Sequence, residues 1–321
     1  MGWSYPTNFN ASTAITYANF VQQAYFQYYV ATNTPQSFGY PPFSTFIQVP
    51  PTGYTLTYNL WYNESLNPFG GWAPAYFGYV CASQANPKQL VMVIRGTENG
   101  EEWTDDIFDS MQEACPVANS TGLVHEGFGS IYKGLLYYTP PSGSFVPPTK
   151  QQTPVPLSQV VAGAQSVMVT GHSLGAALAT LLTLDIALNC KVPVSSYNFA
   201  SPTVGDPTFA AAFNAMIGNL IGANYRVANG VDPVPNQPSS VFYAPGSSQE
   251  LDYMQVNGYC PVDSGLLSLV SDPHSLSNYV IGLTNLGSST LEAKPGQRQR
   301  AGLRAIPRWK GNAVEAEEQV A

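Results

Sequence analysis

The segment Gly171-His172-Ser173-Leu174-Gly175 is the part of this 321-residue sequence whose residue types and spacing are best suited to chemistry. It follows the apolar run 166–170 and precedes the long apolar stretch 175–189, so the sequence predicts a strand, a sharp turn and a helix. Such a turn exposes a serine hydroxyl at the amino terminus of the helix, where backbone amides favour a developing negative charge. The pattern predicts that Ser173 is a nucleophile; the alternative is an ordinary turn serine.

A serine nucleophile needs a base, and the sequence contains three histidines, His125, His172 and His274. On a strand–turn–helix nucleophile the chain order is nucleophile, acid, histidine, so the base lies well downstream of the serine. His274 is the one histidine that meets this condition. We expect His172 to order the turn and His125 to be a hydrogen-bonded structural histidine.

The acid that orients the base should lie at the end of a strand between the serine and the histidine. Asp232 closes the predicted strand 225–231 and is followed by Pro233, so we choose Asp232. Asp206 is the alternative acid. Its structural explanation, a turn or a helix cap, is favoured over a catalytic role.

The elements around these residues alternate between strands and helices, which indicates an α/β fold with a mostly parallel sheet. Residues 139–157 hold six prolines and predict a surface loop. The remaining predictions are helices at 15–29 and 127–138 and strands at 55–62, 76–82, 90–94, 166–170, 194–199 and 225–228.

The composition describes an acidic chain with few charges. Charged residues make up 10% of the sequence, and the formal net charge is −8. Phosphate recognition depends on clustered Lys and Arg, so we expect no nucleic-acid partner. Half of the basic residues lie in 294–321, a stretch without apolar periodicity that we expect to be a disordered tail after a single domain over 1–293.

Several features favour an extracellular protein. The sequence has a low charge content and three glycosylation sequons, beginning at Asn10, Asn63 and Asn119.

The first residues show no basic stretch before an apolar run, so no signal peptide is visible, and no stretch has the length and apolar continuity of a transmembrane segment. The four cysteines include no Cys-x-x-Cys pair, which predicts no metal site.

Separate stretches between about 90 and 280 resemble the class 3 (fungal-type) lipase family of the α/β-hydrolases. The stretches are 94–97 (Ile-Arg-Gly-Thr), 103–107, 124–128, 171–179, 199–205, 226–235, and His274 with Tyr279. The resemblance implies an α/β-hydrolase fold in a single domain with a lid, a central sheet flanked by helices, and a triad of Ser173, Asp232 and His274. It also implies an oxyanion hole at Thr97 and at the amide after the nucleophile, Leu174.

The resemblance places a lid just after Thr97. On a helical wheel over 98–111, Trp103, Ile107 and Met111 share one face and the acidic residues share the opposite face. An apolar stripe of this kind covers a site in water and turns toward lipid. The alternative is a solvated surface helix.

The activity implied is that of a serine ester hydrolase that cleaves acylglycerol esters through an acyl-enzyme, with no cofactor or metal. Alternatives are a feruloyl or short-chain esterase, an enzyme like phospholipase A1, and a catalytically inactive binding scaffold. The expected partners are a lipid or other ester substrate and a transient lipid–water interface. We expect a monomer.

Overall fold

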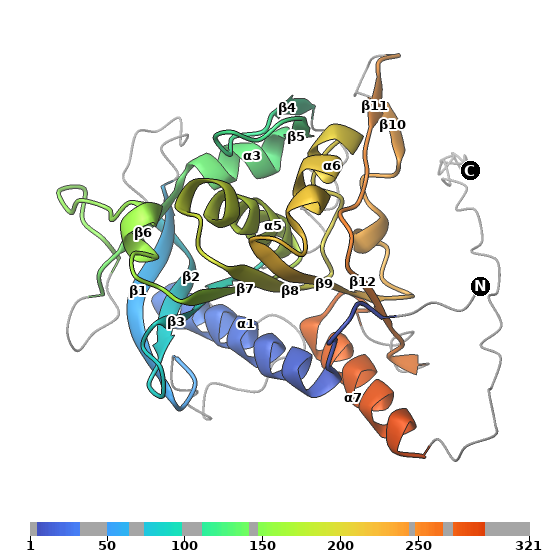
Figure 1. The fold of residues 1–321 in the computed structure, drawn as a ribbon, viewed down its shortest axis with the longest axis horizontal. Coiled ribbons are helices and arrows are strands. Elements are labelled where there is room, and N and C mark those ends of the chain that lie inside the picture. Colours follow the sequence, from blue (N-terminus) through green and yellow to red (C-terminus); the bar gives the residue numbers. More distant parts are fainter. Residues whose placement is uncertain are drawn as a thin grey trace, which may run out of the picture.

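The computed structural model describes residues 5–32, 50–63, 74–97, 111–140, 147–243, 248–265 and 272–292. Within these ranges eight strands form one sheet in the order β12-β9-β8-β7-β3-β2-β1-β6 (Figure 1). The strands from β12 to β3 are parallel, and β2, β1 and β6 continue the sheet antiparallel. Their bounds are β1 Tyr54–Asn63, β2 Pro74–Ser83, β3 Gln89–Ile94, β6 Leu135–Tyr138, β7 Ser166–His172, β8 Val194–Phe199, β9 Ile221–Asn229 and β12 Tyr259–Val262.

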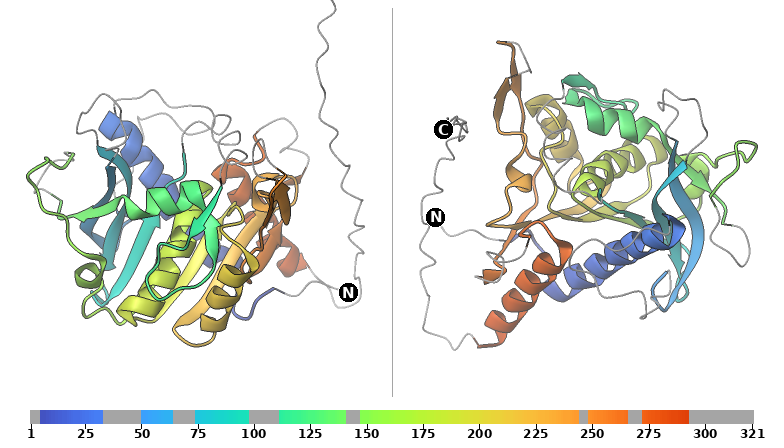
Figure 2. Two further views of the ribbon diagram at one scale, coloured as in Figure 1. Left: turned by 90° about the horizontal axis from the view of Figure 1, so that it is seen from above. Right: turned by 180° about the vertical axis from the view of Figure 1, so that it is seen from behind.

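Helices cover both faces of this sheet (Figures 1 and 2). Helices α1 (Ala11–Thr32) and α7 (Leu276–Glu292) pack on one face, and α3 (Glu126–Lys133), α5 (Leu174–Asp185) and α6 (Pro207–Met216) lie on the other. Burial on both faces explains why β3 reads as a continuous apolar run, buried from Leu90 to Ile94. The fold is the predicted α/β architecture.

Smaller elements complete the described chain. They are a two-stranded ribbon of β4 (Gln112–Ala114) and β5 (Leu123–His125), a second ribbon of β10 (Val241–Tyr243) and β11 (Glu250–Asp252), the helix α4 (Leu157–Val160), and the turns η1 (Ile186–Cys190) and η2 (Val234–Asn236). No helix in the described ranges is long and apolar enough to cross a membrane.

The predicted helix over 127–138 is wrong in its second half. The helix α3 ends at Lys133, and Gly134 caps it. The next four residues form β6, which pairs antiparallel with β1. A short apolar segment fits a helix or a strand equally well by periodicity, and here an unpaired sheet edge decided the outcome.

The other predicted strands and the helix predicted at 15–29 are present with equal or longer bounds, and the apolar helix predicted over 175–189 is the α-helix α5 up to Asp185 and the π-helix η1 after it. The predicted loop 139–157 contains no helix or strand in its described residues up to Pro156, apart from an isolated bridge of Val155 to Tyr137. The proposed tail lies outside the described residues, so the domain boundary at 293 stays a prediction. The four cysteines, all within the described part of the chain, are free thiols.

Candidate active site

The turn between β7 and α5 holds Ser173 in an unusual backbone conformation. Its φ is 57° and its ψ is −127°, a region that residues with a side chain rarely adopt. Two close approaches require glycine here. A Cβ on Gly171 would lie 2.2 Å from the Gly175 carbonyl oxygen, and a Cβ on Gly175 would lie 2.4 Å from the Arg95 carbonyl oxygen. The strained turn therefore presents the Ser173 side chain at the amino terminus of a buried helix.

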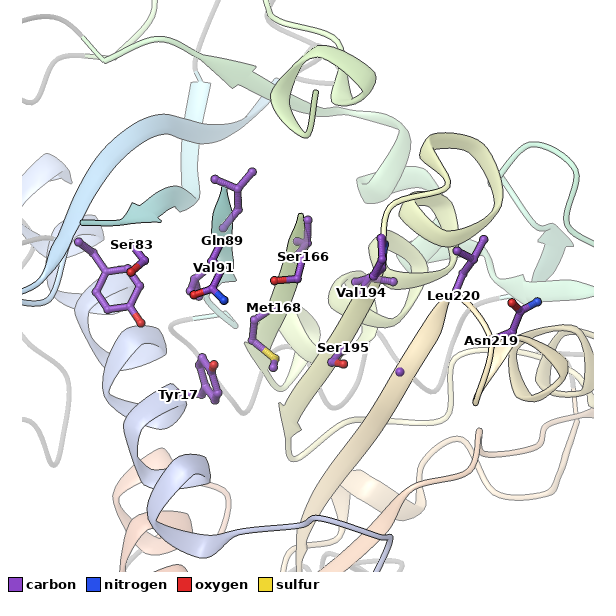
Figure 3. A pocket seen from close by; sticks show the side chains of 15 residues that line it. Tyr17, Ser83, Gln89, Val91, Ser166, Met168, Val194, Ser195, Asn219 and Leu220 are labelled. Atoms are coloured by element: carbon purple, nitrogen blue, oxygen red, sulfur yellow. The ribbon is translucent and has the colours of Figure 1, made fainter. Parts of the chain in front are cut away.

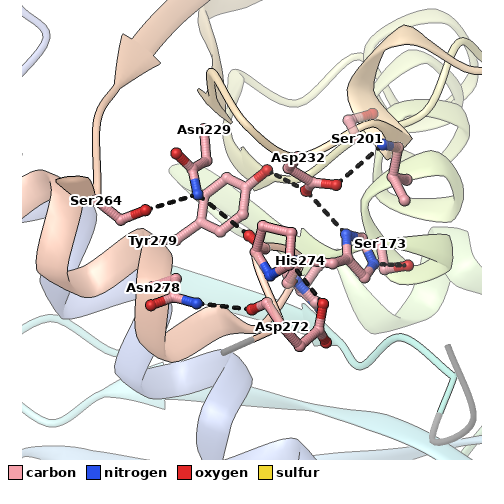
Figure 4. Close-up of polar contacts among 12 residues, drawn as sticks. Ser173, Ser201, Asn229, Asp232, Ser264, Asp272, His274, Asn278 and Tyr279 are labelled. Atoms are coloured by element: carbon pink, nitrogen blue, oxygen red, sulfur yellow. Dashed lines mark hydrogen bonds and ion pairs between the residues drawn. The ribbon is translucent and has the colours of Figure 1, made fainter. Parts of the chain in front are cut away.

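The structure brings the three predicted triad residues into one chain of contacts (Figure 4). Ser173 Oγ lies 2.7 Å from His274 Nε2, and His274 Nδ1 lies 2.9 Å from Asp232 Oδ2. A carboxylate only accepts hydrogen bonds, so His274 Nδ1 carries a proton and Nε2 is the acceptor for the serine hydroxyl. This tautomer is the one that a general base requires.

Asp232 is buried and held by groups besides the histidine. Its Oδ1 accepts the Val234 N–H at 2.9 Å, and its Oδ2 also accepts the Tyr279 hydroxyl at 2.6 Å. The side chain of Asp232 is inaccessible to solvent, whereas that of His274 is 16% exposed. The imidazole thus lies between a buried carboxylate and the solvent side. The sequence offered Tyr279 as part of the family resemblance but gave no sign of this contact.

The loop that carries His274 is tied to the strands by side-chain amides. Asn229, the last residue of β9, donates to the Pro273 carbonyl oxygen at 3.1 Å. Asn278 donates to the Asp272 carbonyl oxygen at 2.6 Å, and the His274 N–H donates to Asp272 Oδ1 at 2.9 Å. These bonds fix the backbone that leads into His274 (Figure 4).

His172 contacts residues outside the turn in which it lies. Its Nδ1 lies 2.9 Å from the Tyr25 hydroxyl, and its Nε2 lies 2.8 Å from the His274 carbonyl oxygen. Burial, followed by the nearby His274 charge, lowers the pKa of His172 well below its usual value, against an opposing hydrogen bond to the His274 backbone. His172 is therefore neutral at physiological pH, and both of its ring nitrogens are occupied, one by the Tyr25 hydroxyl and one by the His274 carbonyl oxygen.

His125 lies away from the serine, at the end of β5. It is buried and stacks on Phe128 with ring centroids 4.3 Å apart, and its N–H donates to the Val204 carbonyl oxygen. Asp206 is the amino-terminal cap of α6, where its side chain accepts the Phe209 N–H at 2.7 Å. Both residues have the structural environments that the sequence favoured.

The two predicted oxyanion donors come from different elements. Leu174 is the first residue of α5, and its N–H belongs to the helix terminus that follows the nucleophile. Thr97 follows β3, which neighbours β7 in the sheet. The preceding Gly96 touches the nucleophile's turn, because a Cβ there would lie 3.0 Å from the Ser173 Cβ. Both segments therefore border Ser173.

The predicted lid lies mostly outside the described residues. Trp103 and Ile107 fall there, and the lid remains a prediction. Met111 is described: it is 37% exposed, and its carbonyl oxygen accepts the Glu126 N–H.

A cavity of about 300 Å³ lies at the amino ends of the parallel strands, at the opposite end of these strands from Ser173 (Figure 3). It is lined by residues at the amino ends of β3, β7, β8 and β9, among them Gln89, Ser166 and Ser195. The triad lies at the carboxyl ends of the parallel strands, where ligands bind in open α/β sheets. The cavity is therefore separate from the candidate site.

Part of this site lies in a region that matches a known protein family. Residues 91–242 match the family described as Lipase (class 3). This matched region contains Ser173 and Asp232, whereas His274 lies beyond its end.

Relatives of this chain include plant and fungal proteins. Phospholipase A1-II 3 of Oryza sativa subsp. japonica is 31% identical over 192 residues, which cover 52% of this chain and 44% of the rice protein. Secreted mono- and diacylglycerol lipase 1 of Fusarium solani is 30% identical over 164 residues, covering 51% of this chain and 43% of the fungal protein. The chain thus spans less than half the length of these curated relatives.

The fold also resembles a solved lipase structure. The Lip2 lipase of Yarrowia lipolytica superposes with a TM-score of 0.52 at 20% identity, over 81% of each chain. At this identity the likeness concerns the fold, and it agrees with the α/β-hydrolase architecture.

Proposed function

We propose that this protein is a serine ester hydrolase that cleaves the carboxylic esters of acylglycerols. One observation carries the proposal: the contact chain from Ser173 through His274 to a buried Asp232 lies at the carboxyl ends of the parallel strands. The match of residues 91–242 to the class 3 lipase family supports the substrate class. The geometry of the three side chains supports the proposed catalytic roles.

The proposed reaction proceeds in two steps. Ser173 Oγ attacks the acyl carbonyl carbon while His274 Nε2 takes the hydroxyl proton, and the buried carboxylate of Asp232 stabilises the imidazolium that forms. The backbone amides of Thr97 and Leu174 donate to the tetrahedral oxyanion. The imidazolium returns the proton to the leaving alcohol, which yields an acyl-enzyme. Water, deprotonated by the same imidazole, then releases the acid and restores Ser173.

A second candidate is the hydrolysis of phospholipids at one acyl position. The rice relative is named a phospholipase A1, and its identity to this chain is about equal to that of the fungal mono- and diacylglycerol lipase. The same triad serves both reactions, since each breaks a carboxylic ester. The substrate groups away from the ester distinguish the two, as they do the feruloyl and short-chain esterase alternatives.

Initial rates on four substrates test the proposal. The substrates are emulsified tributyrin, emulsified triolein, phosphatidylcholine vesicles and soluble p-nitrophenyl butyrate, each with wild type and Ser173→Ala. We expect wild type to cleave the glycerides and the variant to lose about 10⁵- to 10⁶-fold in kcat. Preference for phosphatidylcholine would favour the phospholipase, and activity confined to the soluble ester would favour a short-chain esterase. An inactive wild type without fluorophosphonate labelling of Ser173 would indicate a binding scaffold.

A matched pair of aspartate variants tests the choice of acid. Asp232→Asn should lower kcat about 10⁴-fold because the amide favours the wrong imidazole tautomer. Asp206→Asn should leave kcat within about twofold, since Asn also caps helices. Similar losses in the two variants would contradict the assignment of Asp232.

We propose further that the protein acts outside the cell, as a monomer, at a lipid–water interface. Two of the sequon asparagines, Asn10 and Asn119, are exposed, and the Fusarium solani relative is named as secreted. The apolar stripe of the predicted lid supports the interface. Trp103→Ala should reduce rates on emulsified esters more than on soluble ones, and equal losses would argue against an apolar lid.

A further inference from the structure

Buried side chains surround the segment that carries the proposed oxyanion donor Thr97. The peptide unit between Gly96 and Thr97 contains the Gly96 carbonyl and the Thr97 N–H. In a trans peptide these two groups point in opposite directions within one rigid plane. A group that holds the Gly96 carbonyl oxygen therefore also sets the direction of the Thr97 N–H.

Arg95 holds that carbonyl. Its Nη1 donates to the Gly96 carbonyl oxygen at 2.6 Å, and its Nε donates to the Tyr76 carbonyl oxygen on β2 at 2.6 Å. The guanidinium carbon lies 3.7 Å from the ring centroid of Tyr28 on α1 and 4.9 Å from that of Phe77 on β2. With 5% of its surface exposed, Arg95 is a planar cation fixed between a strand and a helix.

Tyr25, one turn before Tyr28 on α1, holds the other side of Gly96. Its hydroxyl oxygen accepts the Gly96 N–H at 2.9 Å, and the hydroxyl lies 2.9 Å from His172 Nδ1. The second ring nitrogen, Nε2, faces the His274 carbonyl oxygen, which only accepts, so Nε2 carries the proton of the neutral imidazole. Nδ1 is then the acceptor, and the Tyr25 hydroxyl is the donor. Burial raises the pKa of Tyr25, so the hydroxyl keeps its proton.

These contacts form one directed chain of hydrogen bonds. It runs from the Gly96 N–H to Tyr25, from Tyr25 to His172, and from His172 to the backbone of His274. The chain joins the oxyanion segment after β3 to the loop of the proposed base. The hydroxyl in the middle of this chain belongs to Tyr25 on α1, which lies on the face of the sheet opposite α5 (Figure 1).

We propose that Tyr25 and Arg95 are positioning residues that hold the Thr97 amide and the His274 loop in register with Ser173. This inference rests on the ester hydrolysis proposed above. An oxyanion donor is effective only within about 2.7–3.1 Å of the developing charge, and a displacement of about 1 Å can cost on the order of 10²-fold in rate. Neither side chain needs to touch the substrate for this effect.

Tyr25→Phe is the first test, and Tyr79→Phe is its matched control. Tyr79 is also buried, and its hydroxyl donates to the Phe20 carbonyl oxygen of the same helix at 3.0 Å. Tyr25→Phe loses the two hydrogen bonds of a buried hydroxyl on α1, and Tyr79→Phe loses one hydrogen bond to α1 that lies off the chain to His274. Rates are normalised to active sites titrated to completion with a fluorophosphonate, which removes the contribution of unfolded protein.

We expect Tyr25→Phe to lower kcat/KM about 10- to 100-fold on ethyl butyrate, through kcat with KM unchanged, and Tyr79→Phe to stay within about twofold of wild type. The loss should be smaller on p-nitrophenyl butyrate, because that leaving group does not need a proton from His274. A purely structural role would lower the number of titrated active sites and leave the rate per site unchanged on both substrates.

Arg95→Lys provides a second variant. Lysine keeps the charge but cannot bond the Gly96 and Tyr76 carbonyl oxygens from one planar group, so kcat should fall while KM stays unchanged. If Tyr25→Phe and Arg95→Lys both match Tyr79→Phe after normalisation, the inference is wrong. A wild type without activity that depends on Ser173 would instead overturn the proposed function.

Discussion

The helices α5 and α1 lie on opposite faces of the sheet and border the same site in different ways. Helix α5 starts directly after Ser173, so its contribution follows from chain continuity. Helix α1 contributes the hydroxyl of Tyr25, which is 71 residues from Gly96 and 147 residues from His172. One helix is placed by the backbone turn and the other by side-chain contacts.

The physical difference lies in what each helix contributes at the point of contact. On the α5 side, Gly171 and Gly175 allow backbones to approach more closely than a Cβ would permit. On the α1 and α7 side, phenolic hydroxyls of Tyr25 and Tyr279 reach polar atoms of the site. Variants at the glycines should therefore disturb folding, whereas Tyr→Phe variants should disturb rate more than fold.

Gly175→Ala should have the largest effect on stability. The new Cβ would lie 2.4 Å from the carbonyl oxygens of Ile94 and Arg95, both backbone atoms that cannot rotate away. We expect the free energy of unfolding to fall by about 1–3 kcal/mol or more, with loss of activity. Gly287→Ala in α7 is the control, because nothing lies within 4 Å of its Cβ position. That variant should be neutral or about 0.5–1 kcal/mol more stable. Equal urea midpoints for the two variants would contradict the steric argument.

Tyr279→Phe removes the hydrogen bond that Asp232 receives from α7, on the face of the sheet opposite α5. Asp232 Oδ2 would keep His274 as a partner but lose the hydroxyl at 2.6 Å. A hydrogen bond to a charged group contributes about 1.5–3 kcal/mol, and we expect kcat to fall about tenfold as the carboxylate loses its fixed orientation. Tyr243→Phe, at an exposed position, should match wild type. Steady-state rates on p-nitrophenyl butyrate measure the difference, and an unchanged kcat would show that His274 and the Val234 N–H suffice to orient Asp232.

His172→Asn should change the pH dependence of stability. The folded state depresses the pKa of His172, so below about pH 6.5 the unfolded chain takes up a proton that the folded protein does not. This residue therefore lowers the free energy of unfolding as the pH falls, with a slope that approaches about 1.4 kcal/mol per pH unit. Urea unfolding at pH 7, 6 and 5 should show a steeper decline for wild type than for the variant. Parallel curves would mean that His172 does not stay neutral in the folded protein.

The sequence predicted the site residues that are marked by a local motif or by their order along the chain. Ser173 was identified by the glycines two residues on either side, and the chain order of nucleophile, acid and base selected Asp232 and His274 for the positions that the structure brings together. The contact from Tyr279 and the chain through Tyr25 had no such signal. A tyrosine among 20 tyrosines in the sequence carries no spacing that points to a partner more than 40 residues away.

Local sequence indicated the elbow, because the glycines on either side of Ser173 permit the close backbone approaches that this turn needs. The strand predicted at 194–199 is β8, with the same bounds in the structure. Tertiary structure alone decided that residues 135–138 form β6 at the sheet edge, that α1 lies against the oxyanion segment, and that a neutral His172 links Tyr25 to the His274 loop. These outcomes depend on which surfaces meet when the sheet assembles, and that information is spread over residues far apart in the chain.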